Sequence, residues 1–211
     1  MWTDTLRWIV LNTLLAVVPV GAAYTMRSII RQAERHILAK ISVAAIGFIW
    51  LIFLPNTCYL LTEWRHFLDM VGYTNLYAQW QVSSLMAMKL MAYTLFYICF
   101  SGVGLLTFAL AIRPIARTAK EKGFTLWIWG IPLFLINSVG VYLGLIKRFN
   151  SWDIFRRPNE ILKAVADIPG NQDLATLVLL FSIFLWLVYL AVDIWIDGLI
   201  CRYKGHQNIC K

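Results

Sequence analysis

Five long apolar segments constrain this chain more than any other feature of its sequence. Each is near or above the ~20 residues that an α-helix needs to cross ~30 Å of hydrocarbon. Only helices and closed barrels satisfy their backbone inside a bilayer, and the period-2 alternation of a barrel is absent. The sequence therefore predicts an all-α, polytopic helical membrane bundle, with a single integral membrane domain over residues 1–211. The expected spans are 6–24, 41–62, 82–112, 124–146 and 174–200.

The composition and the placement of charge agree with a membrane protein. Hydrophobic residues make up 60% of the chain and charged residues only 14%. The net charge is +8, and its basic residues lie in short loops and not on one folded face. Nucleic acid is therefore not expected as a partner. The expected partner is the lipid bilayer. Basic residues follow the first, third and fifth spans, and the positive-inside rule then predicts an outside N-terminus and a cytoplasmic C-terminus. We expect a bacterial inner membrane as the location.

The loop after the fourth span does not fit this rule. It contains Lys147 and Arg148 and three further basic residues, yet the alternation of spans places it outside. Either the loop departs from the rule for a functional reason, or the number of spans is wrong by one. Acidic residues in the same loop, such as Asp153 and Glu160, offset much of its charge and favour the first explanation.

Two loop segments have the pattern of interfacial helices. In residues 27–40 the isoleucines gather on one side and the basic residues on the other. Residues 158–168 repeat this pattern after Pro158, until Pro169 and Gly170 interrupt it. The predicted fold thus has about five transmembrane helices and two helices at the membrane surface.

The first polar cluster follows Pro55 near the end of the second span. On a helix, Asn56, Tyr59, Glu63, His66 and Asp69 share an arc of roughly 140°. Pro55 should kink this helix and free carbonyl groups where the polar stripe begins. The stripe could face water, pack against a neighbouring helix or form a functional site. Glu63, His66 and Asp69 are spaced as candidate metal ligands, but the spacing is not the two-histidine zincin pattern and no metal is predicted.

The second polar cluster follows the fourth span. Gly140 and Gly144 form a small-xxx-small pair that permits close approach of another helix. The same strip continues into Lys147 and Arg148, followed by Asn150, Ser151, Trp152 and Asp153. Cations beside an aromatic ring and hydrogen-bonding side chains suit an anionic head group, although an interfacial anchor has the same composition.

Three charged side chains within the spans need partners. Lys89 should either snorkel outward or pair with Glu63 or Asp69, which would join the third span to the same site. Asp193 and Asp197 lie one turn apart in the fifth span, and we expect them to pair with Arg113 or Arg117. The candidate polar site comprises Asn56, Tyr59, Glu63, His66, Lys89, Arg148, Asn150, Trp152 and Asp153.

The two clusters together resemble the signatures of a bacterial multi-pass family known as domain of unknown function 1361. Two positions depart from that family's pattern: Cys58, where a second proline is usual, and Glu63, where Asp is more usual. The resemblance covers most of the chain and implies a multi-pass helical fold, but no activity. Its motifs here are Phe53-Leu54-Pro55-Asn56, Tyr59-Leu60, Thr62-Glu63 and His66, then Tyr142-Leu143-Gly144, Arg148 and Asn150-Ser151-Trp152-Asp153.

Three functional hypotheses follow from these clusters. The first is an outward-facing site for a lipid or a lipid-linked anionic head group. The second is a non-catalytic accessory or assembly subunit that binds a membrane protein partner. The third is a membrane-embedded, metal-dependent hydrolase or transferase that uses Glu63, His66 or Asp153. The sequence does not decide between an enzyme and a binding protein, and it indicates no cofactor.

Overall fold

The computed structural model describes residues 2–32, 36–62, 64–73, 76–79, 81 and 83–203, and within them every regular element is a helix. The predicted all-α multi-pass class is confirmed, because five helical segments are long and apolar enough to cross a membrane. The helices are α1 (Trp2–Gln32), α2 (Ile37–Thr62), α3 (Trp64–Tyr73), α4 (Leu76–Gln79), α5 (Ser84–Glu121), α6 (Leu126–Leu145), α7 (Asp153–Arg156), α8 (Pro158–Ala166) and α9 (Gln172–Tyr203).

One of the two expected interfacial helices is a separate element and the other is not. α8 covers most of the predicted segment 158–168, with Pro158 in its first turn. The segment 27–40 is instead divided, since α1 continues to Gln32 and α2 begins at Ile37. The prediction of a separate helix over 27–40 is therefore wrong. Its residues instead extend the two membrane helices beyond their apolar stretches. Adding a residue to an existing helix costs less free energy than nucleating a new helix.

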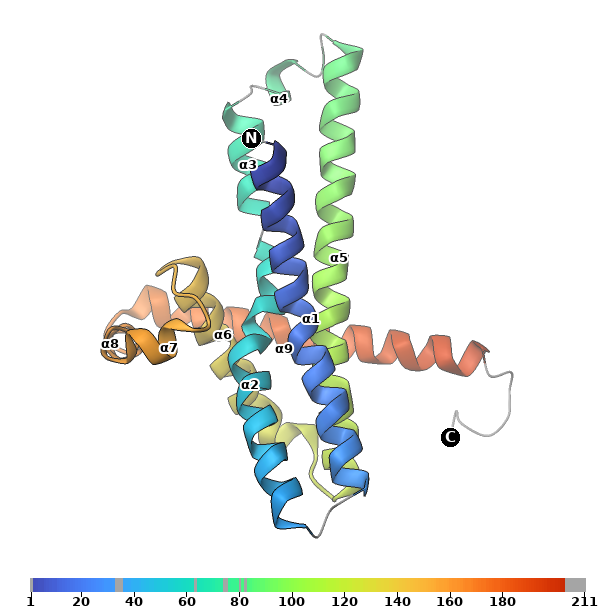
Figure 1. The fold of residues 1–211 in the computed structure, drawn as a ribbon. Coiled ribbons are helices and arrows are strands. Elements are labelled where there is room, and N and C mark those ends of the chain that lie inside the picture. Colours follow the sequence, from blue (N-terminus) through green and yellow to red (C-terminus); the bar gives the residue numbers. More distant parts are fainter. Residues whose placement is uncertain are drawn as a thin grey trace.

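α1, α2 and α5 run alongside one another and pack pairwise (Figure 1). Arg27 and Arg31 on α1 both bind Glu121 at the end of α5, at 3.1 and 2.8 Å. This contact places the end of α1 and the end of α5 at the same end of the molecule. α5 is longer than a perpendicular crossing requires, and its first turns reach α3 and α4 at the opposite end.

α9 crosses α5 at a steep angle in the view of Figure 1 and packs on α5 and α6. Near the crossing, Arg113 and Arg117 of α5 pair with Asp193 and Asp197 of α9. The Arg113 Nε–Asp193 Oδ1 distance is 3.3 Å, and both arginines bind the carboxylate of Asp197. The predicted pairing is therefore confirmed. It balances two negative charges on an otherwise apolar helix, which would be costly to leave unpaired.

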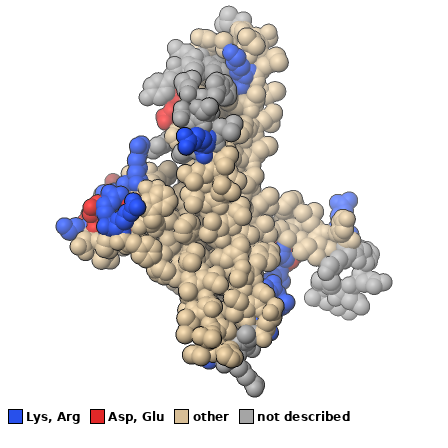
Figure 2. Space-filling model, in the orientation of Figure 1, with Lys and Arg blue, Asp and Glu red and all other residues tan. Residues whose placement is uncertain are grey.

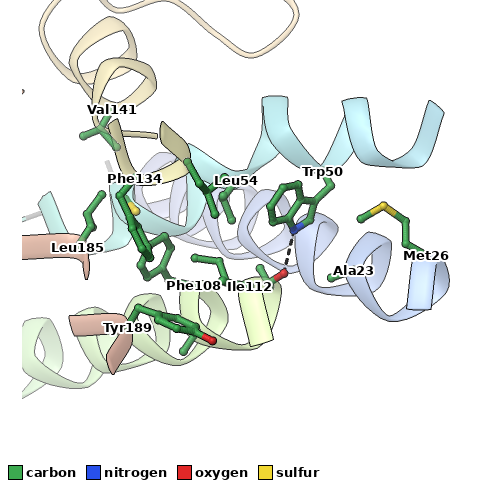
Figure 3. Packing of buried hydrophobic residues seen from close by; sticks show 14 residues of the cluster. Ala23, Met26, Trp50, Leu54, Phe108, Ile112, Phe134, Val141, Leu185 and Tyr189 are labelled. Carbon is green, nitrogen blue, oxygen red and sulfur yellow. Dashed lines mark hydrogen bonds between the residues drawn. The ribbon is translucent and has the colours of Figure 1, made fainter. Parts of the chain in front are cut away.

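The core lies where α2, α5, α6 and α9 meet. Leu54, Phe108, Phe134 and Leu185 interdigitate there, one from each of these helices (Figure 3). Beside them Trp50 donates a hydrogen bond from Nε1 to the carbonyl of Ala111, at 2.8 Å. This bond fixes α2 against α5 at one height along both helices.

Replacing Trp50 by Phe should lower the free energy of unfolding by about 1–2 kcal/mol, because the buried Ala111 carbonyl loses its indole donor. Thermal unfolding in detergent would measure the change. The matched control is Trp195→Phe on the exposed surface of α9, which should leave the midpoint unchanged. Equal effects of the two substitutions would contradict a special role for Trp50.

Candidate functional site

Pro55 lies inside α2 and cannot donate a hydrogen bond to the carbonyl one turn earlier. Polar side chains bond to the carbonyls beside it. Asn56 donates from Nδ2 to the carbonyl of Phe53 at 3.1 Å, and Thr57 donates from Oγ1 to the carbonyl of Leu54 at 2.7 Å. The first polar cluster thus begins with two residues whose side chains donate hydrogen bonds to backbone carbonyls of their own helix.

Ser151 connects the loop after α6 to this part of α2. Asn56 Nδ2 also donates to Ser151 Oγ at 2.9 Å, and Ser151 Oγ lies 3.4 Å from the carbonyl of Ile52, to which it donates. The side chain of Asn56 is buried. The structure therefore brings the start of the first cluster and the middle of the second into direct contact.

Beside this contact, two glycines of α6 allow the close approach of α2. A Cβ atom on Gly140 would lie 2.5 Å from Cγ of Pro55, and one on Gly144 would overlap the hydroxyl of Tyr59. The hydroxyl of Tyr59 donates to the carbonyl of Gly140 at 3.2 Å. The predicted use of Gly140 and Gly144 for close helix packing is confirmed, and Pro55 and Tyr59 are the residues that pack against them.

Asp153 organises the loop from inside. Its side chain belongs to a residue only 3% exposed, and its Oδ2 accepts bonds from the amide of Asn150 at 2.7 Å and from Nη2 of Arg157 at 2.9 Å. These donors, the Asn150 amide first, hold the pKa of Asp153 below its ordinary value against the opposing effect of burial. Arg157 also lies over the ring of Phe149, 5.1 Å from its centroid, and 3.6 Å from a carboxylate oxygen of Glu160. Asp153 is therefore a structural anion in this loop.

Arg148 has a left-handed backbone, with a φ of 58°. Such a conformation is uncommon for a residue with a side chain and costs about 1 kcal/mol or more. It turns the chain out of α6, so that the amide of Phe149 reaches the carbonyl of Leu143 at 3.0 Å. The side chain of Arg148 is exposed, as are those of Lys147 and Asn150.

The exposed cations of this loop outnumber the carboxylates available to them. Asp153 and Glu160 both pair with Arg157. Within the described part of the chain, no ion pair involves Lys147, Arg148 or Arg156. Figure 2 shows basic side chains gathered over the side of the molecule where α7 and α8 lie, with acidic ones among them. Trp152 is also exposed beside them.

The remaining residues of the predicted site lie elsewhere or outside the described residues. His66 and Asp69 are exposed on α3, which packs on α4 and α5, and Lys89 is exposed on α5. In Figure 1 this end of the molecule lies apart from α7 and α8. Glu63 lies outside the described residues, so the geometry of Glu63, His66 and Asp69 as a set of candidate metal ligands is not described. Among the residues that are described, no three His, Cys, Asp or Glu side chains gather as a metal site.

Sequence reasoning did not anticipate some of the groups that build this site. Arg157 was not among the candidates, although its i,i+4 spacing from Asp153 on successive helical turns is a recognisable signal. Asn137, buried on α6, donates to Sγ of Cys58 at 3.2 Å. Cys58 is therefore part of the α2–α6 contact.

A family model described as "Protein of unknown function (DUF1361)" matches residues 11–188, which include both polar clusters and the helices that hold them. No curated protein and no solved structure matches the chain.

Replacing Gly144 by Ala should destabilise the protein by about 1–3 kcal/mol, because the new methyl group overlaps Tyr59 and α2 must move away from α6. Thermal unfolding would measure the loss. Gly102→Ala is the matched control, since open space surrounds that helical position. In a Tyr59→Ala background the cost of Gly144→Ala should be smaller, and an unchanged cost would contradict this contact.

Replacing Asp153 by Asn should loosen the loop at neutral pH, measured as faster hydrogen exchange of the Asn150 amide. Because the pKa of Asp153 is lowered in the folded loop, its contribution is complete above the unfolded pKa of about 3.9 and is lost as pH falls through the folded value. After correction for intrinsic rates, the parent should keep its protection at pH 5–7 and lose it only below about pH 4. Glu160→Gln, at an exposed position, should change little.

Proposed function

This chain belongs to the DUF1361 family, whose description names no activity, and we propose that it binds the anionic head group of a membrane lipid or a lipid-linked molecule. The binding groups are the side chains of Lys147 and Arg148, supported by Arg156. One observation carries the proposal: cations on a tightly bonded loop at the end of a membrane helix have no carboxylate partner among the described residues.

The rigidity of the loop supports binding over simple anchoring. An anchoring Lys or Arg needs only a flexible stem that reaches the interface. Here the backbone is held by Asp153, by the Ser151–Asn56 bond and by the turn at Arg148, and the last of these costs conformational energy. A fixed backbone reduces the entropy lost when several donors close on one phosphate, which is useful to a ligand site.

The orientation of the site belongs to the same proposal. Arg27, Arg31, Arg113 and Arg117 lie toward the end of the molecule where α1 and α5 finish, and a cytoplasmic position for that end satisfies the positive-inside rule. The N-terminus and the loop of residues 146–157 then lie on the outer side of the bacterial inner membrane, and the C-terminus lies in the cytoplasm. The head group would be that of an outer-leaflet lipid.

The chemistry of Asp153 favours binding over hydrolysis. A general acid or base works best with a pKa near the operating pH. The pKa of Asp153 is lowered instead, and its Oδ2 is already occupied by Asn150 and Arg157. This carboxylate is suited to hold the loop and not to move protons.

The double variant Lys147→Ala/Arg148→Gly tests the proposal. Glycine tolerates the left-handed backbone at position 148, so the variant removes two charges and should relieve strain. At ~1 kcal/mol per basic residue near an anionic surface, the preference for phosphatidylglycerol over phosphatidylcholine should fall roughly thirtyfold. Native mass spectrometry of the detergent-solubilised protein with each lipid would measure this preference.

The control for charge is Lys40→Ala/Lys120→Ala, which removes two exposed lysines at the other end of the bundle. It should retain the preference for phosphatidylglycerol. If the parent protein binds both lipids equally, or if the two double variants lose the preference alike, the site does not exist as proposed.

A further inference from the structure

We infer that a groove between α6 and α9 holds one acyl chain of an anionic glycerophospholipid whose head group binds at Lys147 and Arg148. This inference rests on the function proposed above and adds the class of ligand: a diacyl lipid held at both its head and one of its chains.

The groove is apolar and open on one side. It has a cavity volume of about 70 Å³ and is lined by residues of α6 and α9 that include Leu145, Ile146, Leu177 and Phe181. The hydroxyl of Ser138, also in its wall, donates to the carbonyl of Val178 at 2.8 Å and offers nothing further to a polar ligand. Such a lining favours hydrocarbon over water or a polar molecule.

The size of the groove suits part of one acyl chain. Its wall on α6 runs from Ser138 to Ile146, which at 1.5 Å per residue is about 12 Å. A helix of a partner protein is ~10 Å wide with its side chains and is too large for a cavity volume of about 70 Å³. A short stretch of a single hydrocarbon chain is narrow enough to enter it, with the rest of the lipid lying on the protein surface.

The position of the groove links it to the basic loop. Its wall on α6 ends at Ile146, and the next two residues of the chain are Lys147 and Arg148. A lipid with its chain in the groove therefore has its head group at the level of these cations. At this end of the groove, Asp153 and Glu160 pair with Arg157. Lys147 and Arg148 therefore remain to bind a negatively charged head group, which favours an anionic lipid.

The test uses the full chain in phosphatidylcholine nanodiscs that contain a small fraction of phosphatidylglycerol with a diazirine in one acyl chain. After illumination, mass spectrometry maps the labelled residues. We expect labelling of segments 138–146 and 174–181 to exceed labelling of the exposed apolar residues at 187–200 at least tenfold. Uniform labelling of all apolar surfaces would overturn the inference, because the groove would then be ordinary lipid-facing surface.

Two variants narrow the result to the groove. Leu177→Trp should reduce its labelling at least tenfold, since an indole at this position fills the space, whereas Leu179→Trp on the same helix should not. The two leucines are similarly exposed, at 48% and 53%, and only Leu177 lines the groove. No change in the Leu177→Trp variant would also overturn the inference.

Failure of this inference can be distinguished from failure of the proposed function. A preference for phosphatidylglycerol that depends on Lys147 and Arg148, with no concentration of label in the groove, overturns the chain site alone. A phosphatidylcholine probe that labels the groove as strongly as the phosphatidylglycerol probe overturns both, because the head group then contributes no selectivity.

Discussion

The close approach of α2 and α6 is the contact on which the rest of the site depends. Pro55 and Tyr59 occupy the space that side chains at Gly140 and Gly144 would take. In a bilayer, where lipid is as apolar as a leucine surface, such backbone proximity and the Tyr59–Gly140 hydrogen bond are what hold two helices together. Because α6 is held there, the loop that follows it can reach Asn56 through Ser151.

In the loop after α6, some charged side chains pair with one another and hold the loop, whereas others have no ion-pair partner among the described residues. Asp153 takes the Asn150 amide and one nitrogen of Arg157, and Glu160 lies near another nitrogen of the same guanidinium. These bonds consume the nearby carboxylates in holding the loop. Lys147 and Arg148 are left without partners among the described residues, at the point where α6 ends. The proposed ligand would account for the basic residues of a loop expected outside. The five candidate spans agree with the predicted number.

The fold was largely predictable because it follows from apolar length, which is a property of single segments. The positions of α2, α5, α6 and α9 and the pairing of Arg113 with Asp197 could be predicted in this way. The site was predicted only in part. Nothing in the sequence reports how far α3 and the first turns of α5 extend beyond the level of α7, and so His66 and Lys89 were grouped with residues that lie elsewhere. Helix spacing gives the side of a helix that a residue occupies, but not the height at which two helices meet.

The crossing of α9 has a consequence for the proposed ligand site that parallel helices would not have. Two helices aligned along their whole length close the space between them with interdigitated side chains. The C-terminal part of α9 leaves its neighbours beyond the crossing, whereas its first turns pack on the end of α6, where both helices line the apolar groove. The Ser138–Val178 bond joins α6 and α9 within the wall of this groove. An open apolar groove exposed to water would be unfavourable. The acyl chain that we propose for it would fill the void and give the lining atoms the contacts that they lack.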